Sequence, residues 1–314
     1  MIQCDHIRLF EGTILTNTVS SLGYITLNAQ DLPAWKEFGA NILGLMLDEG
    51  ASSEQRLVFR MDDHPSRLLI QQSDQDGLAA VGWEFSDQAT YTQVLATLKK
   101  HGASIELGDE RGAKLRNVVE YAVSADPAGN PFEVYHTRTD LKNDFKSALD
   151  VEQFVTGDMG MGHVVLPAPN MDDTHNFYRS ALGFGDSDNL TLPPPAQGAP
   201  EMNIRFMHAA NARHHSLALF NFPVPTGIVH LILEVNSVDE VGACLDRVTK
   251  AGYPLMSTLG RHCNDNMLSF YVVGPGGIAI EYGCDGMQID WQQYTPTVST
   301  VGDIWGHEYV TPAV

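Results

Sequence analysis

The sequence is poor in basic residues and in cysteine, and it has no long hydrophobic run. It contains 19 Lys and Arg against 39 Asp and Glu, a net charge of −20. Such a surface repels phosphate backbones and anionic lipids, so we expect neither a nucleic-acid binder nor a membrane protein. The four cysteines form no Cys-x-x-Cys pair, and acidic and basic residues interrupt the first 20 positions. These absences predict a cytoplasmic protein with reduced thiols and without a secretory signal.

What is present indicates a folded protein of two domains. The chain has 314 residues, of which 43% are hydrophobic, and its 28 Gly and 16 Pro are spread along its length. A chain of this size can bury two separate cores. Low-complexity disorder is therefore excluded.

The chain contains an internal repeat. Residues 22–45 run in step with residues 161–184, and each stretch reads as a strand followed by a helix that ends at Leu-Gly. Residues from Gly77 and from Gly227 match in the same way, as do the final strands near residues 126–135 and 274–283. Because the copies lie about 140 to 150 residues apart, the repeat predicts two similar halves.

Each half reads as two copies of a βαβββ module. One such module cannot cover both faces of its own sheet, so two modules are expected to pair into one curved sheet. We therefore predict an α+β fold with two domains, residues 1–146 and 147–314, the second ending in a C-terminal tail. Two segments depart from the repeat. The connection after residue 136 is polar with a helix-prone start, and residues 187–202, rich in proline, read as an irregular insertion.

Metal-ligand residue types occur at matching strand positions of the second half only. His163, His230 and Glu281 lie on predicted strands, whereas their counterparts in the first half are Tyr24, Ala80 and Glu133. A lone histidine on a strand is more often a packing residue than a ligand. Two imidazoles and one carboxylate on one face, however, would form the facial triad of non-haem Fe(II) oxygenases. We predict a metal site at these three residues.

The second half also resembles a known family. The family's ring-cleavage signature is matched by Gly260, His262, Phe270, Tyr271, Pro275, Gly277 and Glu281, and further matching stretches are residues 21–45, 159–166, 211–223 and 303–307. The chain thus resembles the type I extradiol ring-cleavage dioxygenases of the vicinal oxygen chelate superfamily, most closely the two-domain group that acts on 2,3-dihydroxybiphenyl. It departs from the signature at Gly274, where the pattern has an acidic, amide or small polar residue.

The resemblance implies a cofactor and a reaction. His163, His230 and Glu281 would bind Fe(II), with Mn(II) as the less common metal. A catechol and O2 would meet at this metal, and the ring would open beside the two hydroxyls, as part of the degradation of aromatic compounds. Homo-oligomers are also implied.

The resemblance further implies roles for surrounding residues. His215 would act as the acid and base, while His214 would be a packing or solvent residue. Catalytic support would come from His262, Tyr271, Asn264 and Asp265, with His262 and Tyr271 also binding substrate. The apolar wall around a second ring would be formed by Val165, Phe206, Ala218 and Phe222.

Other readings stay open at this stage. The substrate could instead be a monocyclic 3-substituted catechol, 1,2-dihydroxynaphthalene or a steroid-derived catechol. A metal-dependent glyoxalase-like isomerase would use similar paired modules, and a metal-free binding protein of the bleomycin-sequestering type is a third class. Uptake of O2 distinguishes the first class from the other two.

Overall fold

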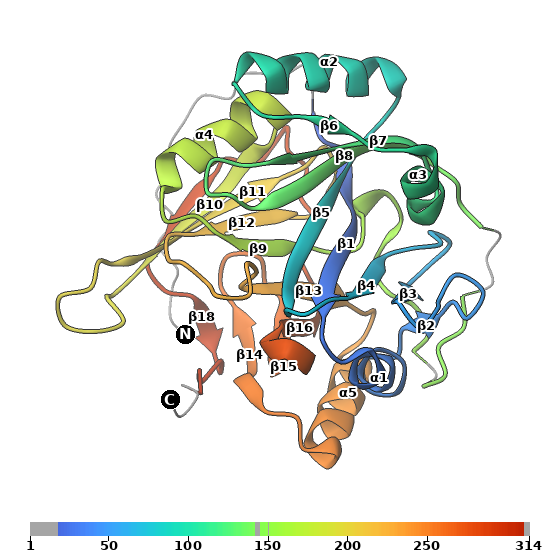
Figure 1. Ribbon diagram of the computed structural model, residues 1–314. Helices are drawn as coiled ribbons and strands as arrows, with labels where there is room; N and C mark the ends of the chain where they lie inside the picture. Colours follow the sequence, from blue (N-terminus) through green and yellow to red (C-terminus); the bar gives the residue numbers. More distant parts are fainter. Residues whose placement is uncertain (1–17, 142–144, 150, 311–314) are drawn as a thin grey trace.

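The computed structural model describes residues 18–141, 145–149 and 151–310. Its core is formed by two large mixed sheets, each of which is curved (Figure 1). The first sheet has eight strands, all from residues 21–138, and the second has ten, all from residues 164–305. The predicted α+β class is confirmed. The domain boundary near residue 146 stays a prediction, because one hydrophobic core cluster contains residues of both halves.

The first half holds two βαβββ modules. The first module comprises β1 (Ser21–Ala29), α1 (Leu32–Glu37) with a π-helical turn (Phe38–Ile42), β2 (Met46–Leu47), β3 (Arg56–Arg60) and β4 (Leu68–Gln72). The second comprises β5 (Gly77–Phe85), α2 (Gln88–Lys100), β6 (Glu106–Leu107), α3 (Glu110–Arg116), β7 (Val118–Ala125) and β8 (Pro131–Arg138). The modules meet where β1 and β5 pair antiparallel, and the strand order is β2-β3-β4-β1-β5-β8-β7-β6.

The second half repeats this plan. Its first module comprises β9 (Val164–Pro167), α4 (Met171–Leu182), β10 (Gly185–Leu192), β11 (Met202–His208) and β12 (Leu217–Phe220). Its second comprises β13 (His230–Glu234), α5 (Val238–Ala251), β14 (Leu255–His262), β15 (Leu268–Val273) and β16 (Ala279–Cys284). Two short tail strands, β17 (Thr297–Ser299) and β18 (Asp303–Trp305), extend the sheet to the order β17-β10-β11-β12-β9-β13-β16-β15-β14-β18.

Local sequence explains where the helices begin and end. Asp31 caps α1 by accepting a hydrogen bond from the Ala34 amide at 2.8 Å, as expected of an N-cap carboxylate. Helix α4 ends at Leu182 because Gly183 adopts the left-handed conformation (φ 76°) that closes a helix. Both boundaries follow the repeat seen in the sequence.

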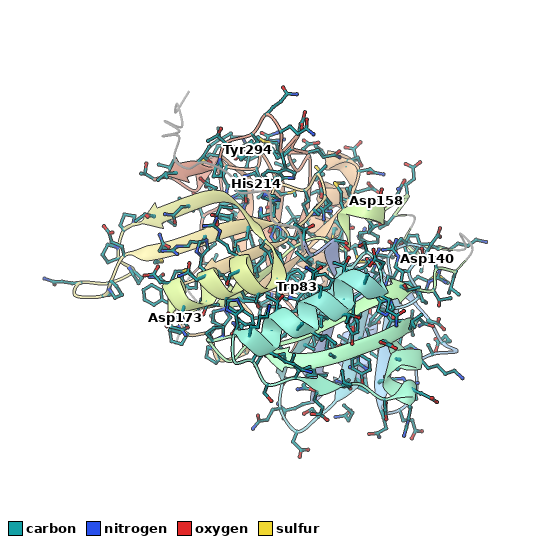
Figure 2. All side chains as sticks on the ribbon, turned by 90° about the horizontal axis from the view of Figure 1, so that it is seen from above. Trp83, Asp140, Asp158, Asp173, His214 and Tyr294 are labelled. Carbon is teal, nitrogen blue, oxygen red and sulfur yellow. The ribbon has the colours of Figure 1, made fainter. Side chains whose placement is uncertain are left out.

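The two halves pack through aromatic side chains. Trp83 of β5 lies edge-on to Phe184 and Tyr178 of the second half, with ring centroids 4.9 and 6.4 Å apart. Helices α2 and α4 run side by side above this contact (Figure 2). Trp83, Tyr178 and Phe184 are thereby fully buried between the two halves.

Two local predictions were wrong. The connection between the halves has no helix among its described residues before the 3₁₀ turn at Gly157–Met159. Residues 187–192 belong to β10, so the irregular insertion is only the loop 193–201 that joins β10 to β11. Residues 187–192 are regular because β10 pairs with both β11 and β17, which satisfies its backbone groups.

No described helix is both long and apolar enough to cross a membrane.

Candidate metal centre

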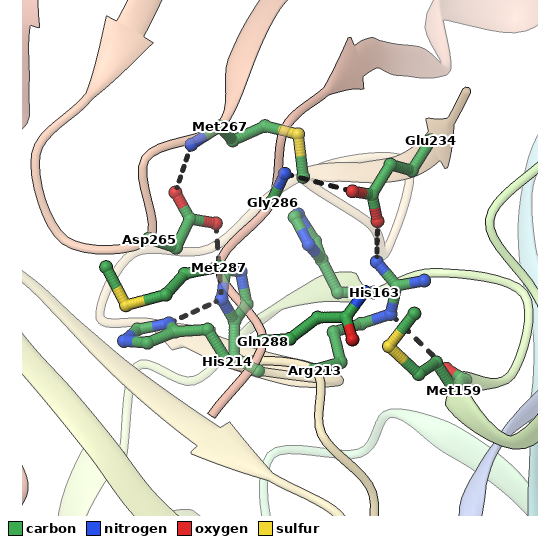
Figure 3. Close-up of a pocket in the computed structure, with 11 residues that line it drawn as sticks. Met159, His163, Arg213, His214, Glu234, Asp265, Met267, Gly286, Met287 and Gln288 are labelled. Carbon is green, nitrogen blue, oxygen red and sulfur yellow. Dashed lines mark hydrogen bonds and ion pairs between the residues drawn. The ribbon is translucent and has the colours of Figure 1, made fainter. Parts of the chain in front are cut away.

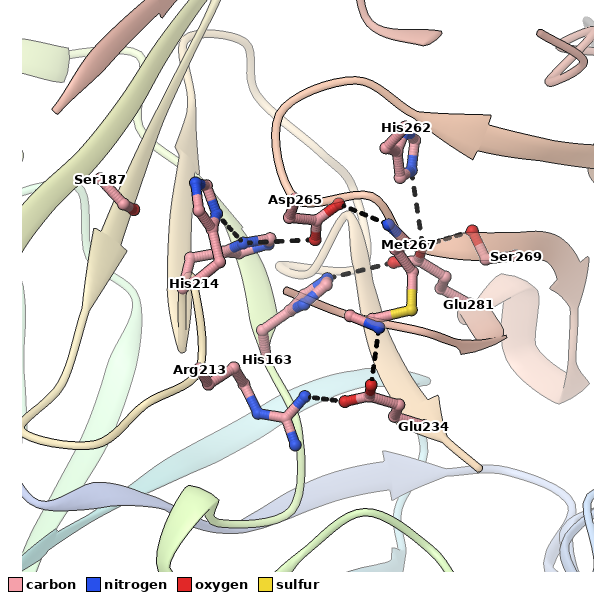
Figure 4. Close-up of polar contacts among 12 residues, drawn as sticks. His163, Ser187, Arg213, His214, Glu234, His262, Asp265, Met267, Ser269 and Glu281 are labelled. Carbon is pink, nitrogen blue, oxygen red and sulfur yellow. Dashed lines mark hydrogen bonds and ion pairs between the residues drawn. The ribbon is translucent and has the colours of Figure 1, made fainter. Parts of the chain in front are cut away.

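Three adjacent strands bring His163, His230 and Glu281 to one point. His163 directly precedes β9, His230 opens β13, and Glu281 lies on β16. His163 Nε2 lies 3.3 Å from His230 Nε2, and Glu281 Oε2 lies 3.1 and 3.3 Å from these two nitrogens. Figure 4 shows His163 and Glu281 facing each other across the site. The repeat-matched positions therefore converge on one face of the sheet.

These three atoms have the spacing of metal ligands. Bonds of about 2.1 Å to one centre place neighbouring donor atoms roughly 3 to 3.4 Å apart. Glu281 Oε2 is buried, and its geometry to neither ring nitrogen is that of a hydrogen bond. Its lone pairs are therefore available to a cation. The donor set fits a divalent transition metal.

The surroundings keep Glu281 and His230 in the protonation states that bind metal. Burial alone would raise the pKa of Glu281, but His163, His230 and His262 hold it well below its ordinary value. Burial lowers the pKa of His230. A carboxylate and a neutral imidazole are thus the stable forms at neutral pH, and both bind metal without first losing a proton.

His262 and Tyr271 form a hydrogen-bonded pair beside the centre. The Tyr271 hydroxyl is 2.7 Å from His262 Nε2, and Asp303 Oδ1 is 2.7 Å from His262 Nδ1. Burial would lower the pKa of His262, yet the hydrogen bonds to Asp303 and Glu281 raise it well above its ordinary value. Residues 260–262 form the end of β14, where they pair with β15 and β18.

His215 lies against His163, with ring centroids 4.0 Å apart. Its Nδ1 is 3.1 Å from His214 Nδ1 and 3.7 Å from Asp265 Oδ2. Burial first, and His163 next, lower the pKa of His215 well below its ordinary value, so the ring is neutral. His214 and His215 lie in the loop before β12, which begins at Leu217.

His214 faces away from the metal centre. Its Nε2 is 3.2 Å from the Tyr294 hydroxyl, and its ring is almost fully buried. It is therefore a packing residue rather than a solvent residue. Beside it, Arg213 pairs with Glu234 in the interior, and a cavity of about 10 Å³ separates this pair from His163 and Asp265 (Figure 3). That volume is close to the minimum for one water molecule.

A larger cavity opens directly above the metal centre. Its volume is about 530 Å³, and its floor includes the three candidate ligands together with His215, His262 and Tyr271. Asn264 and Asp265 also line it, and Asn264 Nδ2 is buried without a hydrogen-bond partner in the described part of the chain. The remote wall is apolar and is formed by Leu190, Leu192, Met202, Ile204, Phe206 and Phe220.

The predicted substrate wall is only partly present in this cavity. Val165 and Phe206 line it, whereas Ala218 and Phe222 are not among its described lining residues. Ala218 is fully covered between Phe206 and Val165, its partners on the neighbouring strands. Phe222 lies beyond the end of β12 and stacks on Phe220, with ring centroids 5.2 Å apart, so Phe220 takes the predicted place.

The sequence did not show that the C-terminal tail contributes residues to the site. Asp303 lines the cavity, and His307 Nδ1 is 2.6 Å from Asp303 Oδ1. Ser269 was also missed; its hydroxyl donates to Glu281 Oε1 at 2.6 Å. The matched stretch 303–307 was the available signal, but its spacing from the other residues gave no sign that it folds back onto β14.

Comparison with known proteins identifies the family. Residues 160–282 match the Glyoxalase/Bleomycin resistance protein/Dioxygenase superfamily, and residues 22–72 match Dihydroxybiphenyl dioxygenase BphC D1. An iron-dependent extradiol dioxygenase of Rhodococcus jostii (strain RHA1) is 39% identical over 93% of this chain and 98% of its own. A biphenyl-2,3-diol 1,2-dioxygenase of Paraburkholderia xenovorans (strain LB400) is 36% identical over 93% and 96%.

A solved structure extends the likeness to three dimensions. The crystal structure of BphC, a halotolerant catechol dioxygenase, superposes with a TM-score of 0.87 at 30% identity, over 95% of this chain and 97% of that one. The resemblance found in the sequence is thus confirmed over almost the whole length. The chain belongs to the extradiol dioxygenases of the glyoxalase and dioxygenase superfamily.

Proposed function

We propose that this protein opens the ring of a catechol with O2 at an Fe(II) ion held by His163, His230 and Glu281. The observation that carries the proposal is the convergence of three ligand atoms within 3.3 Å of one another at the floor of an apolar cavity. Two histidines and one carboxylate are the ligand set of non-haem Fe(II) oxygenases. The name of the Rhodococcus relative supports iron over manganese. When bound, Fe(II) supplies the one-electron chemistry that lets O2 react with the ring.

His215 is suited to move the substrate proton. Its Nδ1 lies toward His214 and Asp265, so Nε2 is the nitrogen left for a ligand in the cavity. Because the ring is neutral, Nε2 can take the proton of a catechol hydroxyl and return it later. Asp265 helps to fix the ring from behind.

The other polar groups orient the diol. The Tyr271 hydroxyl, held by His262 Nε2 at 2.7 Å, borders the cavity floor and is placed to bind a catechol oxygen. Asn264 Nδ2 needs an acceptor that the described residues do not provide, and a substrate oxygen would supply one. These contacts fix which side of the ring faces the metal site.

The apolar wall favours a catechol with a second ring, such as 2,3-dihydroxybiphenyl. A cavity of about 530 Å³ exceeds the needs of an unsubstituted catechol, and Phe206 and Phe220 can pack on an aromatic substituent. The name of the Paraburkholderia relative supports this size of substrate. Other relatives, at 33 to 34% identity, are named for 3-methylcatechol and 1,2-dihydroxynaphthalene, so these diols are the alternatives. We further expect a homo-oligomer in the cytoplasm.

An oxygen-electrode screen tests the proposal. Iron-loaded protein is given catechol, 3-methylcatechol, 2,3-dihydroxybiphenyl, 1,2-dihydroxynaphthalene and a steroid-derived diol, and iron content is measured on the same sample. We expect O2 uptake with a yellow ring-opened product, fastest for 2,3-dihydroxybiphenyl. No uptake with any diol would reject the oxygenase and favour an isomerase.

A further inference from the structure

The C-terminal tail forms part of the wall of the cavity, through Gly302, Asp303 and Tyr309. Strand β18 pairs antiparallel with the end of β14, and Asp303 lies opposite His262. Left-handed backbone at Gly306 (φ 75°) and His307 (φ 51°) then turns the chain against Leu259 and Gly260. A Cβ at Gly306 would lie 2.2 Å from the Leu259 carbonyl oxygen. The tail can therefore reach this position only with glycine at 306.

Asp303 is shared between two histidines. Its Oδ1 lies 2.7 Å from His262 Nδ1 and 2.6 Å from His307 Nδ1. An ionised carboxylate can only accept hydrogen bonds, so both Nδ1 atoms must carry a proton and donate it. For His262 this leaves Nε2 facing the Tyr271 hydroxyl at 2.7 Å, at the floor of the cavity.

His307 connects Asp303 to strand β15. Its Nε2 is 2.9 Å from the Ser269 carbonyl oxygen, and the Ser269 hydroxyl donates to Glu281 Oε1. Figure 4 shows that both Ser269 and His262 contact the Glu281 carboxylate. The tail is thus attached to the same pair of strands, β15 and β16, that carries Tyr271 and Glu281.

We propose that Asp303 is a positioning residue: its carboxylate, also bonded to His307, accepts a hydrogen bond from His262 Nδ1 and so holds the ring in the orientation that presents Nε2 to Tyr271 and the substrate. The proposal rests on the proposed ring-cleavage function. Within the described part of the chain, the hydrogen bonds and ion pairs of Asp303 go to His262 and His307 and not to His163, His230 or Glu281. Its loss should therefore separate turnover from metal content.

The first arm of the test compares kinetics with iron content. In Asp303→Ala, kcat/KM for 2,3-dihydroxybiphenyl should fall by about 10- to 100-fold, the range for lost outer contacts of this kind, with iron per chain unchanged. Asp303→Asn keeps one acceptor oxygen and should retain more activity than Asp303→Ala. The matched control is Asp285→Ala, which removes a carboxylate bonded to Arg261, the neighbour of His262 on β14, outside the cavity. The kcat/KM of this control variant should stay within about twofold of the wild-type value.

The second arm reads the hydrogen bond of His262 Nδ1 directly. Nitrogen NMR of histidine-labelled, metal-free full-length protein, with His262→Gln to assign the signals, should show a hydrogen-bonded, protonated Nδ1 in the wild type. Asp303→Ala should lose that signature while circular dichroism shows an unchanged fold. An unchanged Nδ1 signal, or a loss of activity matched by an equal loss of iron, would overturn the proposal. If the wild type opens no catechol, the proposed function fails, whereas the NMR result still decides the role of Asp303.

Discussion

The guanidinium of Arg116 lies against the carboxylate of Glu133 at the place in the first half that matches Glu281 in the second. Arg116 Nη2 is 2.5 Å from Glu133 Oε1, and the Tyr24 hydroxyl is 2.5 Å from Glu133 Oε2. Tyr24 is the counterpart of His163, and Ala80 is that of His230. The first half therefore keeps a carboxylate at this position, Glu133, but pairs it with the positive charge of Arg116 from the same half.

This pair predicts a large effect on stability. Arg116→Met would leave Glu133, whose side chain is 3% exposed, without its counter-charge. Breaking a buried ion pair from one side costs about 3 to 5 kcal/mol, so the free energy of unfolding in urea should fall by that amount. Lys36→Met is the control, because the exposed Lys36–Glu49 pair should contribute no more than about 1 kcal/mol. Equal losses in the two variants would show that Glu133 does not depend on Arg116.

His215→Asn should separate proton transfer from metal binding. His215 contacts His163 but is not one of the three converging residues, so iron content should stay at the wild-type level. Loss of a positioned acid and base predicts a fall in kcat of about 10² to 10⁴. His101→Gln, at the exposed end of α2, controls for the loss of an imidazole elsewhere. A variant that loses iron along with activity would make His215 a ligand instead.

Phe206 should matter more to substrate size than Phe222. Phe206 lines the cavity, whereas Phe222 stacks behind Phe220. Removal of one aromatic contact is worth about 0.5 to 1.5 kcal/mol. Phe206→Ala should therefore raise KM for 2,3-dihydroxybiphenyl by about 3- to 10-fold while changing KM for catechol little. Steady-state kinetics with both diols checks this. A larger effect on KM from Phe222→Ala than from Phe206→Ala would mean that Phe222 contacts the substrate, as the sequence predicted.

The buried thiols should resist alkylation in the folded protein. Burial raises the pKa of Cys244 and of Cys284 to about 12. A thiol with a raised pKa stays protonated and unreactive as the pH rises from about 7 to about 9. In a Cys4→Ser variant, treatment with iodoacetamide followed by mass spectrometry should label Cys244 and Cys284 only after urea is added. Rapid labelling of Cys244 at neutral pH would mean that the helix α5 contact with the core opens easily.

The repeat explains how much the sequence could predict. Matching positions located His163, His230 and Glu281 because equivalent strands of a repeated module must occupy equivalent places in a sheet. Helix ends followed from local signals such as Asp31 and Gly183. These are properties that neighbouring residues determine.

Other parts depend on contacts between distant residues. Helix α3, which carries Arg116, has no copy among the described residues of the second half, so the repeat could not predict it. Asp303 and His307 reach the site only because the tail pairs with β14. Phe222, which the resemblance placed in the wall, was misplaced because β12 ends at Phe220, so that Phe220 lines the cavity and Phe222 stacks against it.

Iron binding measured together with O2 uptake tests the central claim most directly. Chelator-treated protein is reloaded anaerobically with Fe(II), and the His163→Ala, His230→Ala and Glu281→Ala variants are treated in parallel. We expect one iron per chain and cleavage of 2,3-dihydroxybiphenyl in the wild type, with both lost in each variant and no O2 uptake before reloading. Full iron binding by the variants, or equal O2 uptake by the stripped protein, would contradict the account.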